Sequence, residues 1–515
     1  MKKKAVYFYL ALCLLLCILP VAGMAVYQTD ETTENRKLAA VPLVMKEGHL
    51  NTDYFEECGA WFEDHFSFRK ELVTVDALIQ SRLFSVSNVD TVMTGTDGWL
   101  YYTDTLDDYL RTNTMNPRQV FNVANNVSLL QRYVTEQGAV FAFTVAPNKN
   151  SLYGEHMPWY AGRAGESAKN IDLIEPELAR AGISYVDLFS AFERTDETLY
   201  LKRDSHWNEK GAVLAYNTIF DDLLMEHKTY ETVDVLREKR EIGDLNRMLY
   251  PLAAEPEWNF YYQGERHWDY TTEPKDVEAA WIQTACKTGT GSLLMFRDSF
   301  GNTLLPLMAE HFAEASFSKG VPYLMESYME QYRPEVVIVE KVERNLDEYL
   351  SAPAVIEGLK IEPDQSVERM SAESKDGSES AVMPVADGAG DGTKEQSAVV
   401  ITEGQPKNTQ MKLEESQEDM NYFLLSGDLG DSGLADDTQI FVRLRGQSRD
   451  EDETYEAFTV STEQSDYGFA LYLKKDTLAA FDSENAGTIT ADVLIMKDGA
   501  FQIVDTGELD AQVQP

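Results

Sequence analysis

Short apolar runs alternate with amphipathic stretches through the middle of the chain. Residues 140–145 and 292–296 are two such runs, residues 183–188 and 335–340 are two more, and each lies next to a helical pattern. Buried strands that alternate with helices are typical of a layered α/β domain with a mostly parallel sheet. The pattern therefore predicts a domain of this class over residues 91–350.

The pattern changes on both sides of this domain. Over residues 51–83 apolar side chains recur every three or four positions, which predicts amphipathic helices within a juxtamembrane region at 31–90. Residues 351–420 contain no aromatic side chain and are acidic, which predicts a disordered linker. Strand patterns return at 441–444, 469–473 and 488–496, so a small accessory β-sandwich is expected over 421–515.

The N-terminus has the pattern of a membrane-targeting segment. Lys2, Lys3 and Lys4 precede an uncharged stretch over residues 5–27, and 23 residues at ~1.5 Å each are long enough to cross a ~30 Å hydrocarbon core. Basic residues stay on the cytoplasmic side, so the bulk of the chain is expected to be extracellular, behind a single-pass anchor at 1–30 in the cell membrane. The alternative is a signal segment cleaved near Met24.

Composition excludes one large class of function. With 87 acidic and 45 basic side chains the formal net charge is -42, so no basic stripe can follow the phosphates of a nucleic acid, and no nucleic-acid partner is expected. Only Cys58 and Cys286 lie outside the apolar N-terminal run; free thiols are the favoured interpretation and a disulfide is the alternative. No histidine or cysteine has metal-ligand spacing, so neither a metal nor a cofactor is predicted.

Two segments carry candidate chemistry. Asp204 and His206 lie on a loop before a helix that Asn208 can cap, and Ser299 follows the buried strand at 292–296. This places Ser299 beyond the carboxyl edge of the parallel sheet, where open α/β folds put their sites. A serine hydroxyl needs a base to take its proton, and an imidazole oriented by a carboxylate is the usual one. We therefore expect a Ser299–His206–Asp204 triad.

Together these segments resemble the SGNH hydrolase-like superfamily. Arg297-Asp298-Ser299 at the end of a strand is similar to its first block, and Asp204-Ser205-His206-Trp207-Asn208 to its last. The last block comes first here, a circularly permuted order typical of the AlgX/AlgJ-like alginate O-acetylation family and its Gram-positive DHHW relatives. Ser205 stands in place of the first His of the DHHW name. Arg297 stands in place of Gly, which leaves open an altered backbone at the turn. Further matching segments include Trp61 to Phe66, Asp97 to Tyr101, Pro147 to Lys149, Gly243-Asp244-Leu245, and Glu340 with Glu343-Arg344.

The resemblance implies a fold, a reaction and partners. The fold is an SGNH-like, flavodoxin-like α/β domain, and the reaction is transfer of acetyl to a polysaccharide hydroxyl through Ser299. A multispanning membrane O-acyltransferase would supply the acetyl group. The Ser299 backbone N–H is the first expected oxyanion donor, and the candidates for a second are Asn148, Lys149, Arg297 and Asn345. Two alternatives stay open: a polysaccharide acetyl esterase with the same triad, and a surface binding or scaffold protein without turnover.

Overall fold

The structure is a computed structural model. It describes residues 2–24, 39–46, 49–361, 401–404, 407–431, 433–446, 452–481, 488–497 and 500–510. Most of the predicted linker at 351–420, and the ends of the predicted regions at 1–30 and 31–90, lie outside these residues.

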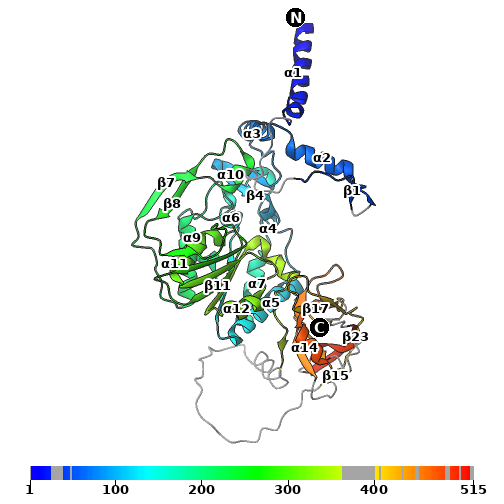
Figure 1. The fold of residues 1–515 in the computed structure, drawn as a ribbon. Helices are drawn as coiled ribbons and strands as arrows, with labels where there is room; N and C mark the ends of the chain where they lie inside the picture. Colours follow the sequence, from blue (N-terminus) through cyan, green and yellow to red (C-terminus); the bar gives the residue numbers. More distant parts are fainter. Residues whose placement is uncertain are drawn as a thin grey trace, which may run out of the picture.

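A seven-stranded, mostly parallel sheet forms the centre of the molecule (Figure 1). Its strand order is β6-β5-β13-β11-β12-β10-β9; the first five strands run parallel, β10 runs antiparallel to β12, and β9 pairs antiparallel with β10 at the edge. The bounds are β5 Val140–Ala146, β6 Tyr185–Val186, β9 Trp268–Tyr270, β10 Trp281–Cys286, β11 Ser292–Phe296, β12 Glu314–Ser318 and β13 Val336–Val342. This confirms the predicted fold class.

Helices cover both faces of this sheet because the strands are apolar on both faces. Along β13, Val336 and Ile338 pack with α8, α9 and α11, whereas Val337 and Val339 pack with α5, α7 and α12. This is the two-residue alternation of a strand buried on both sides. The helices are α5 Pro117–Glu136, α7 Asn170–Arg180, α8 Leu188–Glu193, α9 Glu209–Asp222, α11 Gly301–His311 and α12 Met325–Tyr332.

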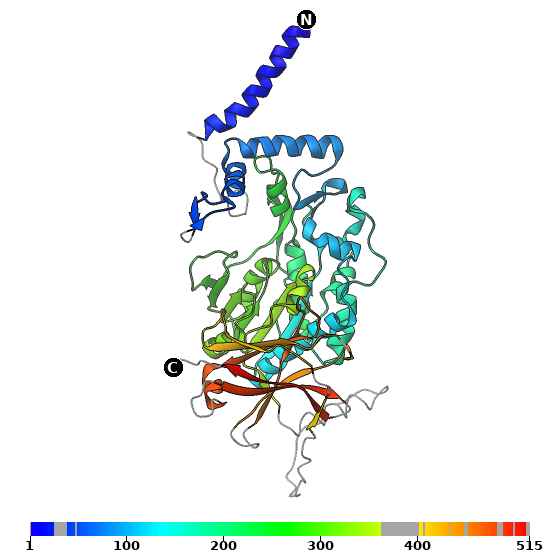
Figure 2. The same cartoon turned by 90° about the vertical axis from the view of Figure 1, so that its right-hand side faces the viewer.

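Two further sheets form a β-sandwich at the C-terminal end. A six-stranded sheet has the order β14-β19-β18-β22-β23-β15, a four-stranded sheet has the order β16-β17-β21-β20, and side chains from both share one core. Their bounds are β14 Leu359–Lys360, β15 Ile401–Glu403, β16 Lys412–Glu415, β17 Tyr422–Asp428, β18 Ile440–Leu444, β19 Glu453–Glu456, β20 Phe458–Val460, β21 Gly468–Lys474, β22 Thr488–Lys497 and β23 Ala500–Asp510. Figure 2 shows these strands across the end of the molecule that is farthest from α1 (Lys2–Gly23).

At both ends of the predicted linker the structure describes ordered strands, where disorder was expected. Strands β14, β15 and β16 fall within 351–420, and each gains its strand structure by pairing with a longer strand of the sandwich. They are short and polar, so their composition gives no strand signal. The sandwich is also fixed to the α/β domain, because Phe458, Val460 and Ala470 join the core beneath α5.

Helices lie between α1 and the α/β domain, as the spacing over 51–83 predicts. They are α2 (Tyr54–His65), α3 (Arg69–Ile79) and the π-helical turn η2 (Gln80–Phe84). Within the described residues, α1 alone is long and apolar enough to cross a membrane, over Val6–Gly23 with a mean hydropathy of 2.4, a test that a signal sequence also passes. Cys58 and Cys286 are both free.

Candidate active site

Ser299 lies on a tight connection between β11 and α11, at the carboxyl edge of the parallel strands. Two hydrogen bonds from the Asp298 carboxylate hold this turn: Oδ1 accepts from the Phe300 N–H at 2.8 Å, and Oδ2 accepts from the Val342 N–H at 2.6 Å. Asp298 thus ties the turn to the end of the neighbouring strand β13. Ser299 itself is half-buried, and its backbone N–H has no acceptor among the residues that the structure describes.

Asp204 and His206 lie on the loop before α9, which Asn208 caps as predicted by accepting the Gly211 N–H at 3.0 Å. Lys149 is buried beneath this loop, and its ammonium donates to the carbonyl oxygens of Leu201, Lys202 and Asp204. The Glu257 carboxylate accepts the N–H groups of Lys202 and Arg203 at 2.7 and 3.0 Å. The loop is therefore held from both sides by side chains distant in sequence.

The structure brings the three predicted triad residues together. The Asp204 Oδ1 lies 2.7 Å from His206 Nδ1, and His206 Nε2 lies 2.8 Å from the Ser299 hydroxyl. Because the carboxylate accepts the Nδ1 proton, the lone pair of the imidazole is on Nε2, facing the hydroxyl. This is the arrangement in which an imidazole takes a proton from a serine nucleophile.

Electrostatics favour the same roles. Burial opposes the charged form of His206, but the charge and hydrogen bond of Asp204 outweigh burial and raise the pKa of His206 above its ordinary value. Burial likewise opposes ionisation of Asp204, yet His206 and the N–H groups of His206 and Asp244 lower the pKa of Asp204 to about 2. Asp204 therefore stays ionised near neutral pH and stabilises the imidazolium that forms when His206 accepts a proton.

Asp244 forms a second clamp on this loop that the sequence did not assign. Its Oδ1 accepts the Ser205 N–H at 2.8 Å, its Oδ2 accepts the Ser205 hydroxyl, and its own N–H donates to Asp204 Oδ2 at 2.9 Å. Ser205, which stands where the DHHW pattern has its first His, thus anchors the loop. The only available signal was the Gly243-Asp244-Leu245 segment, which carried no stated role.

Arg344 is a second unassigned group beside the triad. Its guanidinium lies 5.8 Å from the ring centre of Phe300 and 5.4 Å from that of Tyr102, and the Phe300 ring in turn packs on the His206 ring at 4.8 Å. It forms no ion pair with any carboxylate within the described parts of the chain. Arg344 thus places an uncompensated positive charge near the imidazole, where it acts to lower the pKa of His206.

We expect Arg344→Gln to move the acidic limb of the pH profile of kcat/KM to higher pH. Removing the cation makes the imidazolium easier to form, so the pKa of His206 rises and the neutral base is lost at a higher pH. Initial rates with an acetyl ester are measured from pH 5 to 9, a range that includes the ordinary histidine pKa of about 6.5, and they give the position of the acidic limb. Arg344→Lys keeps the charge and is the control; a limb that stays in place in Arg344→Gln contradicts the assignment.

Arg297 points away from the nucleophile despite its position in the motif. Its side chain is buried, and its guanidinium donates to the carbonyl oxygens of Val277 at 2.8 Å and Asp298 at 3.2 Å, and to the Asn302 amide oxygen. The backbone at Arg297 is not in the left-handed region. No Gly-specific dihedral is therefore needed here, and the turn accepts Arg without strain.

A buried carboxyl group lies beneath the same turn. Glu340 on β13 is fully buried, its Oε2 accepts the Asp298 N–H at 3.1 Å, and its Oε1 has no hydrogen-bond partner within the described chain. Burial first, and the neighbouring Asp298 carboxylate second, raise the pKa of Glu340 well above its ordinary value. Burial therefore favours the neutral acid form of Glu340, which holds the Ser299 turn through the Asp298 N–H.

We expect Glu340→Gln to remove a loss of stability at high pH. When the pKa of a group is higher in the folded state than in the unfolded state, the group stabilises the fold at pH values below its unfolded-state pKa. This stability is lost as the pH rises towards the folded-state pKa, by up to about 1.4 kcal/mol per pH unit. Gln keeps the oxygen that accepts from Asp298 and cannot ionise, so the variant gains stability relative to the wild type as pH rises. Urea unfolding at several pH values measures this, with the exposed Glu314→Gln as control. Parallel curves for Glu340→Gln and wild type would contradict a neutral Glu340.

The other oxyanion candidates differ in whether their donor groups already have hydrogen-bond partners. Asn148 is fully buried, donating its amide to Asp108 Oδ2 at 2.8 Å and its N–H to Glu343 Oε2 at 2.9 Å. Lys149 is engaged with the loop carbonyls described above. Asn345, which follows β13 in the 3-10 helix η7 (Glu343–Leu350), is half-buried and its amide has no hydrogen bond with the described residues. Asn345 therefore has an unused donor, as does Arg297, whose buried Nε–H has no partner in the described chain.

Asp204, His206 and Asp244 also form the one group with metal-like spacing found in the described residues, with donor atoms within 4.8 Å of one another. Each of these donors is already engaged: both carboxylates accept backbone N–H groups, and the imidazole bonds Asp204 and Ser299. The close spacing of these three residues is therefore explained by the hydrogen bonds that position the His206 imidazole.

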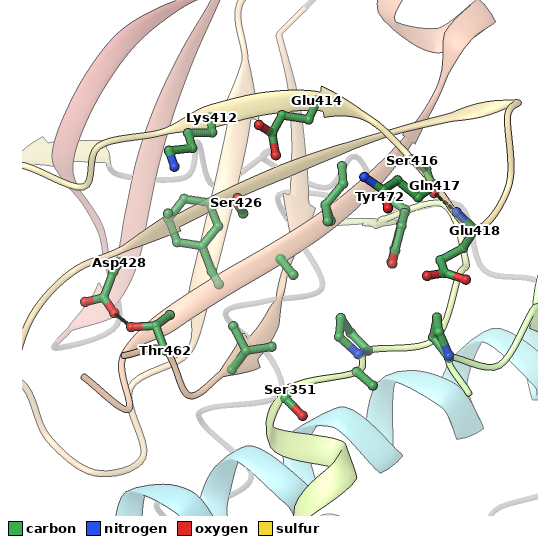
Figure 3. A pocket seen from close by; sticks show the side chains of 18 of the residues that line it. Ser351, Lys412, Glu414, Ser416, Gln417, Glu418, Ser426, Asp428, Thr462 and Tyr472 are labelled. Atoms are coloured by element: carbon green, nitrogen blue, oxygen red, sulfur yellow. Dashed lines mark hydrogen bonds between the residues drawn. The ribbon is translucent and has the colours of Figure 1, made fainter. Parts of the chain in front are cut away.

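A separate hollow lies on the accessory sandwich (Figure 3). It has a volume of about 830 Å³, with strands β16, β17, β20 and β21 forming much of its wall and residues 351–353 closing another side. Lys412, Glu414 and Tyr472 are among its lining residues, and a Thr462–Asp428 hydrogen bond lies at its rim. No triad residue lines this hollow. The candidate active site therefore rests on the hydrogen-bond geometry of the triad and not on the size of a cavity.

Comparison with known proteins supports the motif-based resemblance. Residues 92–286 match the family model described as SGNH hydrolase-like domain, acetyltransferase AlgX; the match includes Asp204 and His206 and ends before Ser299. No curated protein matches the chain.

Several solved structures are similar at low identity. PatB1 of Bacillus cereus is 17% identical, with 50% of this chain and 98% of that chain covered and a TM-score of 0.41. A DHHW family protein from Eubacterium siraeum is 16% identical, with 46% and 90% covered and a TM-score of 0.38. AlgX of Pseudomonas aeruginosa is 14% identical, with 82% and 91% covered and a TM-score of 0.34. Residues 92–286 of this chain are thus similar to the SGNH hydrolase-like domain described for the acetyltransferase AlgX.

Proposed function

We propose that this protein is an extracytoplasmic, membrane-anchored O-acetyltransferase that acetylates a polysaccharide through Ser299, His206 and Asp204. The observation that carries the proposal is the continuous hydrogen-bond chain from Asp204 through His206 to the half-buried Ser299 hydroxyl, inside a domain of the AlgX type. The N-terminal helix α1, with its apolar 18 residues, supports the anchor.

The proposed reaction has two steps. Ser299 Oγ attacks the carbonyl carbon of an acetyl ester while His206 Nε2 takes its proton, and the Ser299 N–H and a second donor stabilise the oxyanion. The ester bond breaks, and His206 returns the proton to the leaving oxygen. A sugar hydroxyl then gives its proton to His206 and attacks the carbonyl carbon of the acetyl-serine. The bond from that carbon to Ser299 Oγ breaks, His206 returns the proton to Ser299 Oγ, and the acetylated sugar is released.

Within the described residues α1 is the one candidate span, and a single span cannot itself carry an acetyl group across a membrane. We therefore propose a multispanning membrane O-acyltransferase as the donor partner. Asn345 and Arg344 are the proposed groups for the second oxyanion contact, because both lie at the carboxyl end of β13 with no hydrogen bond to the described protein.

Product analysis tests the reaction. The purified full-length protein is given p-nitrophenyl acetate with and without a panel of cell-surface oligosaccharides, and acetylated sugar and free acetate are measured by mass spectrometry. Acetylated sugar that requires His206 supports the transferase. Free acetate alone, equal with and without acceptor, would make the protein an esterase that uses the same three residues. If neither product forms, enzymatic function is refuted and a scaffold role is left.

A further inference from the structure

Helix α3 and the turn η2 carry a row of apolar side chains that the protein leaves uncovered. Leu72, Val75, Ile79 and Leu83 are 41%, 54%, 47% and 72% exposed. Their spacing of three, four and four residues places them on one face of a helix. Four aliphatic side chains aligned in this way make a continuous apolar stripe rather than scattered surface residues.

The opposite face of α3 is the one that packs on the α/β domain. Ala77 is fully buried in a cluster with Val92, Leu100, Leu245 and Leu249. Thr74 is 6% exposed, and its hydroxyl oxygen accepts the Leu252 N–H at 3.2 Å. These contacts fix the orientation of α3, so the apolar stripe on its opposite face points away from the protein.

This stripe lies where α1 reaches the rest of the molecule. The end of α1 contacts the residues just before α3: a Cβ added at Gly23 would lie 2.7 Å from the Ser67 Cβ and 3.1 Å from the Phe68 ring. Figures 1 and 2 both show α1 leaving the molecule on this side, with the C-terminal sheets at the opposite end. The uncovered face of α3 and the apolar helix α1 are thus on the same side of the domain.

We propose that α3 and η2 lie along the outer surface of the membrane, with Leu72, Val75, Ile79 and Leu83 immersed among the lipids. This inference rests on the proposed anchoring by α1. A helix with one apolar face, placed directly beside a membrane span, lies in the interface with that face about 5–10 Å deep. The membrane is favoured over a protein partner because the contact with α1 already brings the stripe to the level where the span ends.

The consequence is a fixed orientation of the enzyme domain. A single span alone permits the domain to swing and rotate on its connection, whereas a second contact at α3 fixes which side faces the lipid. Asp76, the acidic residue on the exposed side, bonds the Asn88 amide at 2.8 Å within the protein, and Arg82 lies at the edge of the stripe, as expected for a side chain that meets phosphate headgroups.

Lipid quenching tests this in the full-length protein. An environment-sensitive fluorescent amino acid is introduced singly at Leu14 in α1, at Leu83, and at Leu224, a leucine that is 92% exposed on the α/β domain. The variants are reconstituted in two sets of phosphatidylcholine and phosphatidylglycerol vesicles, one with acyl chains brominated near the headgroup, which reports on Leu83, and one brominated near the chain end, which reports on Leu14. We expect quenching at Leu83 to exceed that at Leu224 by about threefold or more, because contact quenching reports a depth of about 5–10 Å.

A second variant separates docking from anchoring. Ile79→Asp on the exposed face is expected to abolish the quenching at Leu83 while the quenching at Leu14 persists. If Leu83 matches Leu224 while Leu14 is quenched, the stripe does not bind lipid and the inference is overturned, with a protein partner as the remaining occupant. If Leu14 is unquenched, the anchor and the inference both fail. Acetyl transfer measured on the same samples reports on the proposed activity independently.

Discussion

Ser299→Ala is expected to lower acetyl-ester turnover by about 10⁴-fold or more, because no other group can replace the nucleophile. The Ser299 hydroxyl is the group that meets His206 Nε2, at 2.8 Å. The side chain is small and half-buried, so its loss leaves the fold intact. Initial rates of p-nitrophenol release from the acetate ester by the purified protein measure the effect.

The controls for this prediction use the same chain. His206→Ala is expected to cost about as much, and the double variant no more than either single one, because groups that act as a unit are not additive. Ser190→Ala, in the middle of α8, keeps the rate within about twofold, as expected for a substitution away from the site. A Ser299→Ala protein that retains more than about a tenth of the wild-type rate would place the nucleophile elsewhere.

Arg118→Ala is expected to destabilise the protein by about 3 kcal/mol or more, because it leaves buried carbonyl oxygens without a charged donor. Arg118, at the start of α5, is 2% exposed. Its guanidinium donates to the carbonyl oxygens of Asp466, Asp436 and Thr438 at 3.1, 3.0 and 2.6 Å and stacks on the Tyr467 ring at 4.4 Å. All four partners belong to the accessory sandwich, so urea unfolding is expected to split into two transitions.

The matched control is Arg180→Ala, on the surface of α7, where the guanidinium is 55% exposed and pairs with Glu177. An exposed pair of this kind contributes about 0–1 kcal/mol, and a single transition is expected. If Arg118→Ala unfolds in one transition near the wild-type midpoint, the sandwich is not held to the α/β domain by this side chain.

Four strands of the central sheet, β5, β6, β11 and β13, were predictable from their short apolar runs, whereas β9, β10 and β12 were not predicted. Strand β11 has the predicted bounds, and β5 and β13 differ from prediction by one or two residues at their ends. Only Tyr185–Val186 of the predicted strand at 183–188 pairs with β5, because this edge strand turns into α8 directly afterwards. The short strands β14 to β16 were missed, since their structure comes from pairing partners and not from their own composition.

The three residues of the proposed triad were predicted for different reasons. Asp204 and His206 are two residues apart, so a hydrogen bond between them could be anticipated, whereas Ser299 was placed beside them because it follows a buried strand at the carboxyl edge of the sheet. Asp244 and Arg344 were quoted in motifs but given no role, because their contacts with the site depend on tertiary packing. The buried Asn126 of α5, which binds Thr459 of the sandwich, has no local signal at all.

The position of β13 in the sheet sets when the proposed site can first form as the chain folds. The strand lies between β5 and β11, and the Asp298 carboxylate that holds the nucleophile turn bonds the Val342 N–H at its end. A growing chain that already contains Ser299, His206 and Asp204 still lacks this wall, and pairing over so long a separation is slow. The proposed site is therefore complete only after residues 336–342 have inserted beside a strand that lies almost two hundred residues earlier in the chain.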